Sequence, residues 1–401
     1  MNNYRRRIVY VIAMIAVFSL IATGASAKNF RGQRAKNIIF MVPDGMGLSY
    51  VTATRIYKNG PDGDRLSFEK FPVIGYQSTH SLNSTVTDSA AAASAWASGA
   101  KFNNGEISCH DNDFDGTCDG KQVPTILDIA QSMGKSTGLV ATSGITHATP
   151  ASFGANVHNR KCEEEIARQF LERKIDVLLG GGIAKNRSSC KLTHSADEDI
   201  TNLVNDYISA GYTLATTKEE MDAAVGANAP RLLGLFTPDG KSPELFRVDA
   251  AIEYPAGEPT LPEMTSAALD LLEENRKGFF LMIEGSQIDW SGHANDPDYQ
   301  MGEMLAFDES VERVLNWVDA RPLRRMKTLV VVVADHETGG HAIDGPYGSL
   351  SESGNMVQSG WTSTNHSAVD TVIWARGPGS RYFGQALDNT ELYYLMLNAM
   401  K

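Results

Sequence analysis

Short runs of hydrophobic residues recur along the chain, and they predict its strands. Within each run nearly every residue is apolar, rather than every second one, which is typical of strands buried on both faces of a sheet. The predicted strands are Asn37–Val42, Ser136–Ala141, Asp176–Leu179, Leu232–Phe236, Phe279–Ile283, Thr328–Ala334 and Val372–Ala375.

Amphipathic segments lie between several of these runs and predict helices. They are Glu163–Arg173, Ile200–Ala210, Pro262–Asn275 and Glu303–Val318. Buried strands that alternate with helices indicate a mostly parallel sheet with helices on both faces. The sequence contains no internal repeat, low-complexity tract or linker rich in Pro, Gly and Ser. It therefore predicts a single large α/β domain, in which the less regular stretch 185–262 forms a peripheral elaboration.

The first 27 residues have the layout of a secretory signal peptide. Arg5–Arg7 precede the apolar run Ile8–Ile21, and a small-residue A-x-A cleavage site ends at Ala27. An N-terminal anchor helix is the alternative, but 14 apolar residues are short for a membrane span, which needs about 20. We therefore predict a cleaved signal at 1–27 and a mature chain, 28–401, that is periplasmic or secreted and has no stable membrane anchor.

The composition and charge exclude several classes of protein. The chain has 401 residues, 42% hydrophobic and 21% charged, which is the composition of a globular protein and not of a disordered or multi-span one. Its 48 acidic and 36 basic residues give a net charge of −12. Loss of residues 1–27 removes three arginines and no acid, leaving −15 over 374 residues. Nucleic-acid binding requires a basic surface, so this balance argues against it.

Four cysteines in an exported chain indicate two disulfides. Three connectivities are open, and we favour the nearest-neighbour pairs Cys109–Cys118 and Cys162–Cys190. Because the spacing is not C-x-x-C, neither a cysteine zinc site nor a redox motif is expected.

Side chains that can bind cations follow four of the predicted strands. In chain order they are Asp44, His147 with Thr149, Glu284, and Asp335 with His336. Ligands of open α/β sheets bind outside the carboxyl ends of the strands. We therefore expect the fold to bring these groups together at one edge of the sheet.

Two segments add further carboxylates and imidazoles. IEGSQIDWSGH places Glu284, Asp289 and His293 in an E-x4-D-x3-H pattern, and His366 lies in TNHSAVD. Carboxylates with imidazoles suit zinc, whereas carboxylates with hydroxyls suit magnesium. Each motif alone is weak evidence, because an isolated Asp-His pair is more often part of a surface loop. Several of them at the strand ends of one sheet indicate a metal site.

The segment VTDSAAAASAWASGAK contains a candidate nucleophile. Ser89 precedes an alanine-rich run that predicts a helix. A serine in this place is most often only the N-cap of the helix. Its hydroxyl would also lie at the positive end of the helix dipole, where phosphate binds well, and a neighbouring zinc ion could lower its pKa.

Together these motifs resemble those of the alkaline phosphatase family. PDGMG, TDSAAAASAWASG, HATPASFGANVHNR, EGSQIDWSGH, ADHETGGH and the late His366 occur in the family order, from about Ala35 to the C-terminus. The resemblance implies a single α/β catalytic domain that hydrolyses small phosphate monoesters with an alkaline optimum. It also implies two Zn²⁺ ions, one Mg²⁺ ion and a homodimer.

The resemblance further implies a role for each residue of the motifs. Ser89 would form a phosphoserine intermediate, Arg160 would clamp two phosphate oxygens, and Asp88 would orient Arg160. The implied metal ligands are Asp289, His293 and His366 for one zinc; Asp44, Asp335, His336 and the nucleophile Ser89 for the other; and Asp44, Thr149 and Glu284 for the magnesium.

Two positions depart from the pattern of the best-known bacterial members. His147 stands where they have aspartate, as in animal members, and Trp290 stands where they have lysine. These differences put the identity of the third metal in doubt. The missing cation at Trp290 predicts faster release of phosphate, whereas packing alone is the alternative role for this side chain.

An acidic segment lies between the first two cysteines. Asp111–Gly116 resembles the start of a calcium loop, but Gln122 occupies the position where such a loop has its bidentate acid. A solvated loop closed by a disulfide is the alternative.

Three other functions are alternatives for a chain with these residues. A phosphodiesterase on the same metal scaffold is the main alternative, but the clamp of Arg160 suits the dianionic phosphate of a monoester. A sulfatase would need a modified cysteine or serine in a C/S-x-P-x-R context, and Ser89 is followed by alanines instead. An exported protein that binds metal or phosphate without catalysis is the third.

Overall fold

The computed structural model describes residues 34–112, 115–119, 123–182 and 200–401. The segment 1–27 that was predicted to be a signal peptide lies outside these ranges. A central sheet is formed by β1 (Asn37–Pro43), β2 (Val73–Ser78), β3 (Ser136–Gly144), β4 (Val177–Gly181), β5 (Thr213–Ala215), β6 (Leu232–Leu235), β7 (Phe279–Gly285), β8 (Thr328–Val333), β13 (Thr371–Arg376) and β14 (Ala386–Asp388).

The sheet is mostly parallel, as the sequence predicts. Its ten strands follow the order β14-β2-β13-β8-β1-β7-β3-β4-β6-β5. Every neighbouring pair from β8 to β5 is parallel. Only β13 runs against both of its neighbours, β8 and β2. All seven predicted strands belong to this sheet.

Helices occupy most connections between the strands and the segment after the last strand. They are α2 (Leu48–Asn59), α3 (Ser89–Ser98), α4 (Ile126–Ser132), α5 (Ala148–Gly154), α6 (Glu163–Arg173), α7 (Ile200–Ser209), α8 (Lys218–Gly226), α9 (Leu261–Leu272), α10 (Gln287–Ala294), α11 (Pro297–Asp319), α12 (Pro322–Lys327) and α13 (Asn389–Met400). The four predicted helices correspond to α6, α7, α9 and α11. Helix α11 begins earlier than predicted because the side chain of Asp296 caps it and Pro297 fits its first turn.

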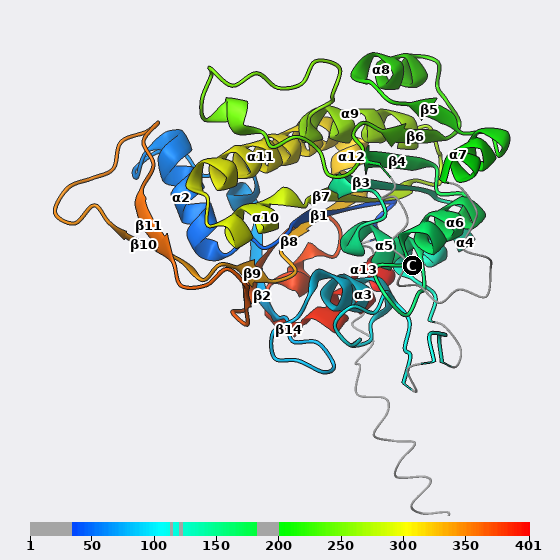
Figure 1. Ribbon diagram of the computed structural model, residues 1–401, viewed down its shortest axis with the longest axis horizontal. Helices are drawn as coiled ribbons and strands as arrows, with labels where there is room; N and C mark the ends of the chain where they lie inside the picture. The colour runs from blue at the N-terminus through cyan, green and yellow to red at the C-terminus, as the bar shows by residue number, and fades with distance from the viewer. Residues whose placement is uncertain (1–33, 113–114, 120–122, 183–199) are drawn as a thin grey trace, which may run out of the picture. The chain divides into compact units, whose positions relative to one another are not determined.

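Both faces of the sheet are covered by helices, with α9 and α11 on one face and α4, α5 and α13 on the other (Figure 1). Phe40 of β1 packs against Trp96 of α3 and Phe153 of α5. Its neighbour Ile39 belongs to the core cluster that also contains Phe307 of α11. Side chains on both sides of β1 are therefore buried, which explains why its sequence is apolar at successive positions.

The stretch 185–262 contributes to one edge of the sheet. Its described part contains α7, β5, α8 and β6, and β6 pairs in parallel with β4 and β5. The residues from 236 to 260 contain no strand or helix longer than the short 3-10 helix Leu245–Arg247. The regular part of this stretch thus extends the central sheet, and the irregular part follows it.

Two small antiparallel sheets lie after β8. One pairs β9 (Glu337–Thr338) with β12 (His366–Ser367), and the other pairs β10 (His341–Gly345) with β11 (Gln358–Trp361). None of the helices in the described residues is both long and apolar enough to cross a membrane.

A disulfide joins Cys109 to Cys118, as predicted. The second predicted pair includes Cys190, which lies outside the described residues. Within the acidic segment, Asp111 is buried and its carboxylate accepts hydrogen bonds from the backbone N–H groups of Asp115 and Gly116. Gln122 also lies outside the described residues.

Candidate active site

Three carboxylates meet at the carboxyl ends of neighbouring parallel strands. Asp44 directly follows β1, Glu284 lies near the end of β7, and Asp335 is the second residue after the end of β8. Strand β1 lies between the other two, with Val42 level with Glu284. All three carboxylates are fully buried. The sheet therefore brings together the acids that the strand ends predict.

His336 joins two of these carboxylates to the candidate nucleophile. Its Nε2 atom lies 3.0 Å from Asp335 Oδ2, 3.6 Å from Asp44 Oδ1 and 3.3 Å from Ser89 Oγ. Asp44, Asp335 and His336 each point one ligand atom into a common space, with these atoms all within 4.8 Å of one another. This donor set of two carboxylates and one imidazole suits zinc.

A second group of ligand atoms lies beside the first. Asp289 and His293 are four residues apart on α10, so they share one face of the helix, and His366 comes from β12. His293 Nε2 is 3.3 Å from Asp289 Oδ2, and His366 Nε2 is 3.4 Å from Asp289 Oδ1. The ring of His366 stacks on that of His336 at 3.5 Å. The ligand atoms of Asp289, His366 and His336 all lie within 4.8 Å of one another. His293 lies beside them, with its Nε2 atom 3.1 Å from His366 Nε2.

Backbone carbonyls orient two of these imidazoles. The Nδ1 atom of His293 lies 2.6 Å from the carbonyl of Thr364, and that of His366 lies 2.9 Å from the carbonyl of Thr87. A carbonyl accepts only a proton-bearing nitrogen, so each ring holds its proton on Nδ1 and leaves Nε2 to bind a metal.

The buried carboxylates lack the partners that would make their burial favourable. The oxygens of Asp44 and Glu284 have no hydrogen bond of ordinary geometry within the described residues. Burial, reinforced by repulsion from Asp335 and Asp289, raises the pKa of Asp44 well above its usual range. Burial also raises the pKa of Glu284 to about 7. Buried carboxylates without cations are costly, so divalent metal ions fit this site.

Thr149 lies close to Glu284 and could share a third metal with it. Its Oγ1 is buried and has no ordinary hydrogen-bond partner in the described part of the chain. The hydroxyls of Ser286 and Thr149 partly offset the effect of burial on the pKa of Glu284. A hydroxyl beside a carboxylate is the kind of donor set that magnesium prefers.

Ser89 is the first residue of α3, and its hydroxyl faces the metal-binding groups. The N-cap is Asp88, whose side chain accepts a hydrogen bond from the N–H of Ala91 at 2.9 Å. The interpretation of Ser89 as a simple N-cap is therefore wrong. Every side chain of α3 is buried, and the alanines allow the helix to pack closely against α5 and α13.

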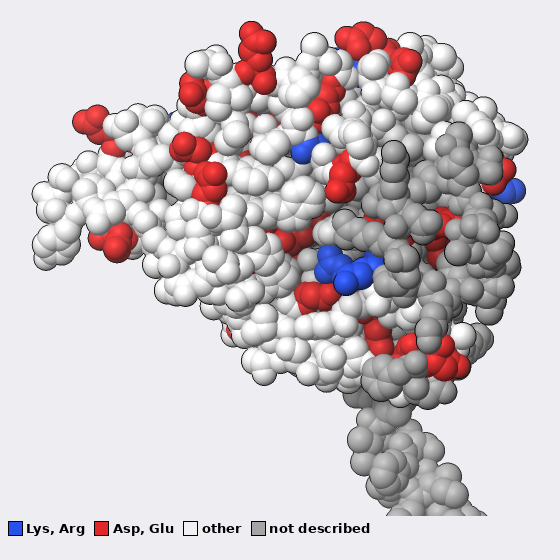
Figure 2. Space-filling view, in the orientation of Figure 1, with Lys and Arg blue, Asp and Glu red and all other residues white. Residues whose placement is uncertain are grey.

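The guanidinium of Arg160 is held beside the start of α3. Its Nη1 lies 3.0 Å from Asp88 Oδ2, and its Nη2 lies 3.1 Å from His147 Nε2. Figure 2 shows basic side-chain atoms gathered at a hollow in the face that carries α3 and α5, while most other charged side chains on this face are acidic. Asp88 therefore caps the helix and also holds Arg160.

Trp290 packs between His147 and the loop that contains Gly240. The two rings meet edge to face with 6.1 Å between their centroids. A Cβ on Gly240 would come within 2.5 Å of the Trp290 ring, so only glycine fits there. Trp290 thus lies next to the residue that contacts Arg160.

Comparison with known proteins agrees with this geometry. A model of the alkaline phosphatase family matches residues 35–356. The chain belongs to the alkaline phosphatase family. It is 31% identical to alkaline phosphatase 3 of Bacillus subtilis, covering 100% of this chain and 98% of that protein. It is 33% identical to the alkaline phosphatase of Escherichia coli, covering 94% and 88%.

Solved alkaline phosphatase structures share the fold. The enzyme from the Antarctic bacterium TAB5 superposes with a TM-score of 0.73 at 30% identity, covering 92% of this chain and 98% of that one. The enzyme from Thermus thermophilus gives a TM-score of 0.77 at 27% identity, covering 95% of each chain. A histidine-to-aspartate variant of the TAB5 enzyme is described with Mg bound in the M3 site.

Thr338 is a site residue that the sequence did not reveal. Its hydroxyl donates a hydrogen bond to Asp289 Oδ1 and lies 3.3 Å from His336 Nδ1, and its N–H donates to the carbonyl of Gly45. It therefore contacts one residue from each group of ligand atoms. A threonine gives no metal-site signal in a single sequence, but its position two residues after the Asp-His pair could have suggested it.

We expect Thr338→Val to lower metal affinity or turnover by about 10–100-fold, the usual cost of losing an outer partner of a ligand. Valine keeps the shape of the side chain but cannot donate to Asp289. Metal content and turnover should be measured for this variant and for Thr338→Ser, which retains the hydroxyl. Equal losses in both variants would show that packing, and not the hydrogen bond, matters at this position.

Proposed function

We propose that the chain hydrolyses phosphate monoesters through a phosphoserine intermediate on Ser89. The observation that carries the proposal is the position of Ser89 Oγ at the start of α3, 3.3 Å from His336 Nε2 and on the same side of the sheet as the buried acids. Ser89 Oγ forms a bond to phosphorus while the bond to the leaving alcohol oxygen breaks. Water then attacks phosphorus and releases inorganic phosphate and the serine hydroxyl.

The chain's own donors fit the metals of the family. We assign Asp289, His293 and His366 to one zinc, Asp44, Asp335 and His336 to a second that also lies next to Ser89, and Asp44, Thr149 and Glu284 to magnesium. When bound, such ions lower the pKa of hydroxyl and water oxygens and stabilise negative charge on oxygen.

Arg160 binds and orients the phosphate. Its planar guanidinium can donate two parallel hydrogen bonds to a dianionic phosphate, and Asp88 fixes its position through Nη1. The N–H groups at the start of α3 add positive electrostatic potential at the same place. The net negative charge of the chain therefore does not prevent binding of an anion, because the local charge at the site is positive once metals are bound.

The test of this proposal compares a monoester with a diester. Turnover of p-nitrophenyl phosphate should exceed that of bis(p-nitrophenyl) phosphate in the wild type, and Arg160→Gln should lower kcat/KM for the monoester by about 100-fold, since it removes two charge-assisted hydrogen bonds. The same substitution should lower kcat/KM for the diester by a smaller factor. Faster diester turnover, unaffected by this substitution, would instead identify a phosphodiesterase.

Trp290→Lys should strengthen product inhibition. A lysine at this position would add a cation near the phosphate site, so we expect the inhibition constant of inorganic phosphate to fall about tenfold, consistent with one charge-assisted hydrogen bond. Trp290→Phe, which keeps an aromatic side chain against Gly240, serves as the matched control. An inhibition constant that stays the same or rises in Trp290→Lys would show that Trp290 is only a packing residue.

We further propose that the protein is exported and works as a homodimer. The N-terminal signal pattern at 1–27 and the disulfide between Cys109 and Cys118 support export. The dimer rests on the family resemblance. Mass spectrometry of the exported chain and its sedimentation behaviour test both points.

A further inference from the structure

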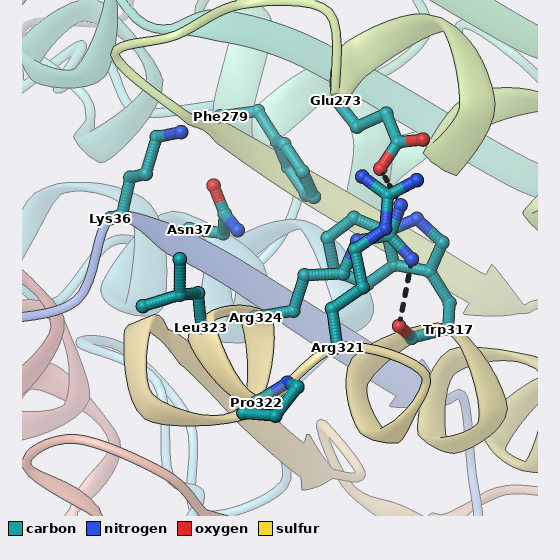
Figure 3. Close-up of a pocket in the computed structure, with 9 residues that line it drawn as sticks. All are labelled: Lys36, Asn37, Glu273, Phe279, Trp317, Arg321, Pro322, Leu323 and Arg324. Carbon is teal, nitrogen blue, oxygen red and sulfur yellow. Dashed lines mark hydrogen bonds and ion pairs between the residues drawn. The ribbon is translucent and has the colours of Figure 1, made fainter.

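A cavity lies at the amino ends of the parallel strands, at the opposite edge of the sheet from the candidate active site. Asn37, the first residue of β1, and Phe279, the first residue of β7, line it, together with residues of α12 (Figure 3). Its volume is about 290 Å³. Glu284 lies near the other end of β7, so this cavity is separate from the proposed metal site.

The cavity carries more positive than negative charge. Lys36, Arg321 and Arg324 line it, and Glu273 is its one carboxylate. Arg324 is already engaged, because its guanidinium donates to Glu273 and to the carbonyl of Trp317 (Figure 3). Across the described ranges, neither Lys36 nor Arg321 forms an ion pair. Both side chains are exposed, so they are accessible to a ligand from solvent.

Aromatic and aliphatic groups form the rest of the wall. The rings of Phe279 and Trp317 meet edge to face at 5.6 Å. Arg324 lies over the Trp317 ring at 4.4 Å, which fixes the guanidinium and the indole against each other. Leu323, 73% exposed, adds an apolar side chain to the wall. Because Phe279 is 1% exposed and Arg324 covers the Trp317 ring, Leu323 and the exposed part of Trp317 form the open apolar wall beside Lys36 and Arg321.

We propose that this cavity binds a small organic anion with a flat apolar body and a carboxylate or similar oxyanion head. Leu323 and the exposed part of Trp317 would pack against the body, and the positive charges of Lys36 and Arg321 would attract the head. The volume is at the lower end for ligand sites, so it suits a body of one or two rings. The proposal does not depend on the proposed phosphatase activity, since no residue is shared between the two sites.

Calorimetric titration of the full-length chain with 2-naphthoate tests this site. We expect a Kd in the high micromolar to millimolar range, as befits a ligand of this size. The double variant Lys36→Gln/Arg321→Gln should bind at least tenfold more weakly. The matched control is Arg325→Gln/Lys327→Gln, which removes the same charge from exposed residues of α12 that do not line the cavity, and it should bind as the wild type does.

Two further measurements show whether binding needs the charged head and whether it occurs at this cavity. The neutral 2-naphthol should bind at least tenfold more weakly than 2-naphthoate, and Arg160→Gln should leave naphthoate affinity unchanged. Phosphatase activity of both double variants should match that of the wild type, which shows that they fold. Equal affinity in the two double variants, equal binding of naphthol, loss of binding in Arg160→Gln, or no naphthoate binding to the wild type would each overturn the proposal.

Discussion

Ser89→Ala is expected to lower turnover of p-nitrophenyl phosphate by on the order of 10⁴-fold or more, the scale of loss when a covalent nucleophile is removed. The substitution deletes the oxygen that would carry the phosphoryl group in the proposed phosphoserine. It leaves Asp88 free to cap α3 and to hold Arg160, because both interactions use the aspartate side chain. Substrate binding should therefore survive much better than turnover does.

Ser98→Ala is the matched control for this variant. Ser98 lies on the same helix, is equally buried, and donates its hydroxyl to the carbonyl of Ser94 rather than facing His336. Its activity should stay close to that of the wild type. Both variants should retain the wild-type metal content. Substantial turnover by Ser89→Ala with full metal content would sink the phosphoserine mechanism.

The central strands were predictable because burial on both faces leaves a plain signal in the sequence. Strand β2 was missed for the opposite reason. It lies next to the edge strand β14, and Ile74 and Tyr76 are 53% and 48% exposed, so its sequence, VIGYQS, is not a continuous apolar run. The direction of β13 could not be predicted either, because the path of the chain between two strands, and not their composition, decides whether they pair in parallel.

The acids at the site could be predicted from one rule of sheet geometry. Asp44, Glu284 and Asp335 each follow or end a buried strand, so a parallel sheet must place them at the same edge. Which ligands share an ion could not be predicted this way. His336 belongs to both groups, and its ring stacks on that of His366, which comes from a distant segment.

Gly45 in the PDGMG motif has a structural role that the motif alone does not reveal. Its φ is 75°, and a Cβ there would lie 2.7 Å from the Cα of Asp289. The same residue donates its N–H to Asp335 Oδ1 and accepts from the N–H of Thr338. Residue 45 therefore connects the segments that carry both groups of ligands, and only glycine fits that backbone.

Removal of metal is expected to abolish activity and also to destabilise the fold. Without divalent ions the buried carboxylates of Asp44 and Glu284 lack a compensating cation and are repelled by Asp335, and an uncompensated buried charge costs about 3–5 kcal/mol. Chelation with EDTA should therefore lower the melting temperature together with turnover, and added Zn²⁺ and Mg²⁺ should restore both.

The metal-free protein should also lose stability as the pH rises. Burial raises the pKa of Glu284 from 4.5 to about 7 and raises that of Asp44 as well. Above about pH 4.5 these two carboxyl groups therefore bind more protons in the folded chain than in the unfolded chain. The resulting stabilisation is complete below the unfolded pKa and disappears as the pH rises through the folded pKa near 7. The same rise in pH frees the carboxylates for metal, so the metal-bound form should be favoured at alkaline pH.

The variant Asp44→Asn tests whether repulsion among the buried carboxylates, and not some other effect of EDTA, destabilises the metal-free protein. Asparagine removes one of the repelling charges, so the metal-free variant should melt at a higher temperature than the metal-free wild type, although it should be inactive. Asp176→Asn is the matched control, because Asp176 is a largely buried carboxylate with a raised pKa that accepts a hydrogen bond from Thr137, outside the site. Its metal-free form should gain less stability than that of Asp44→Asn, because burial and not repulsion from other acids raises the pKa of Asp176. If the two variants gained equally, or if EDTA left the wild type active, repulsion among these acids would not be what the metals relieve.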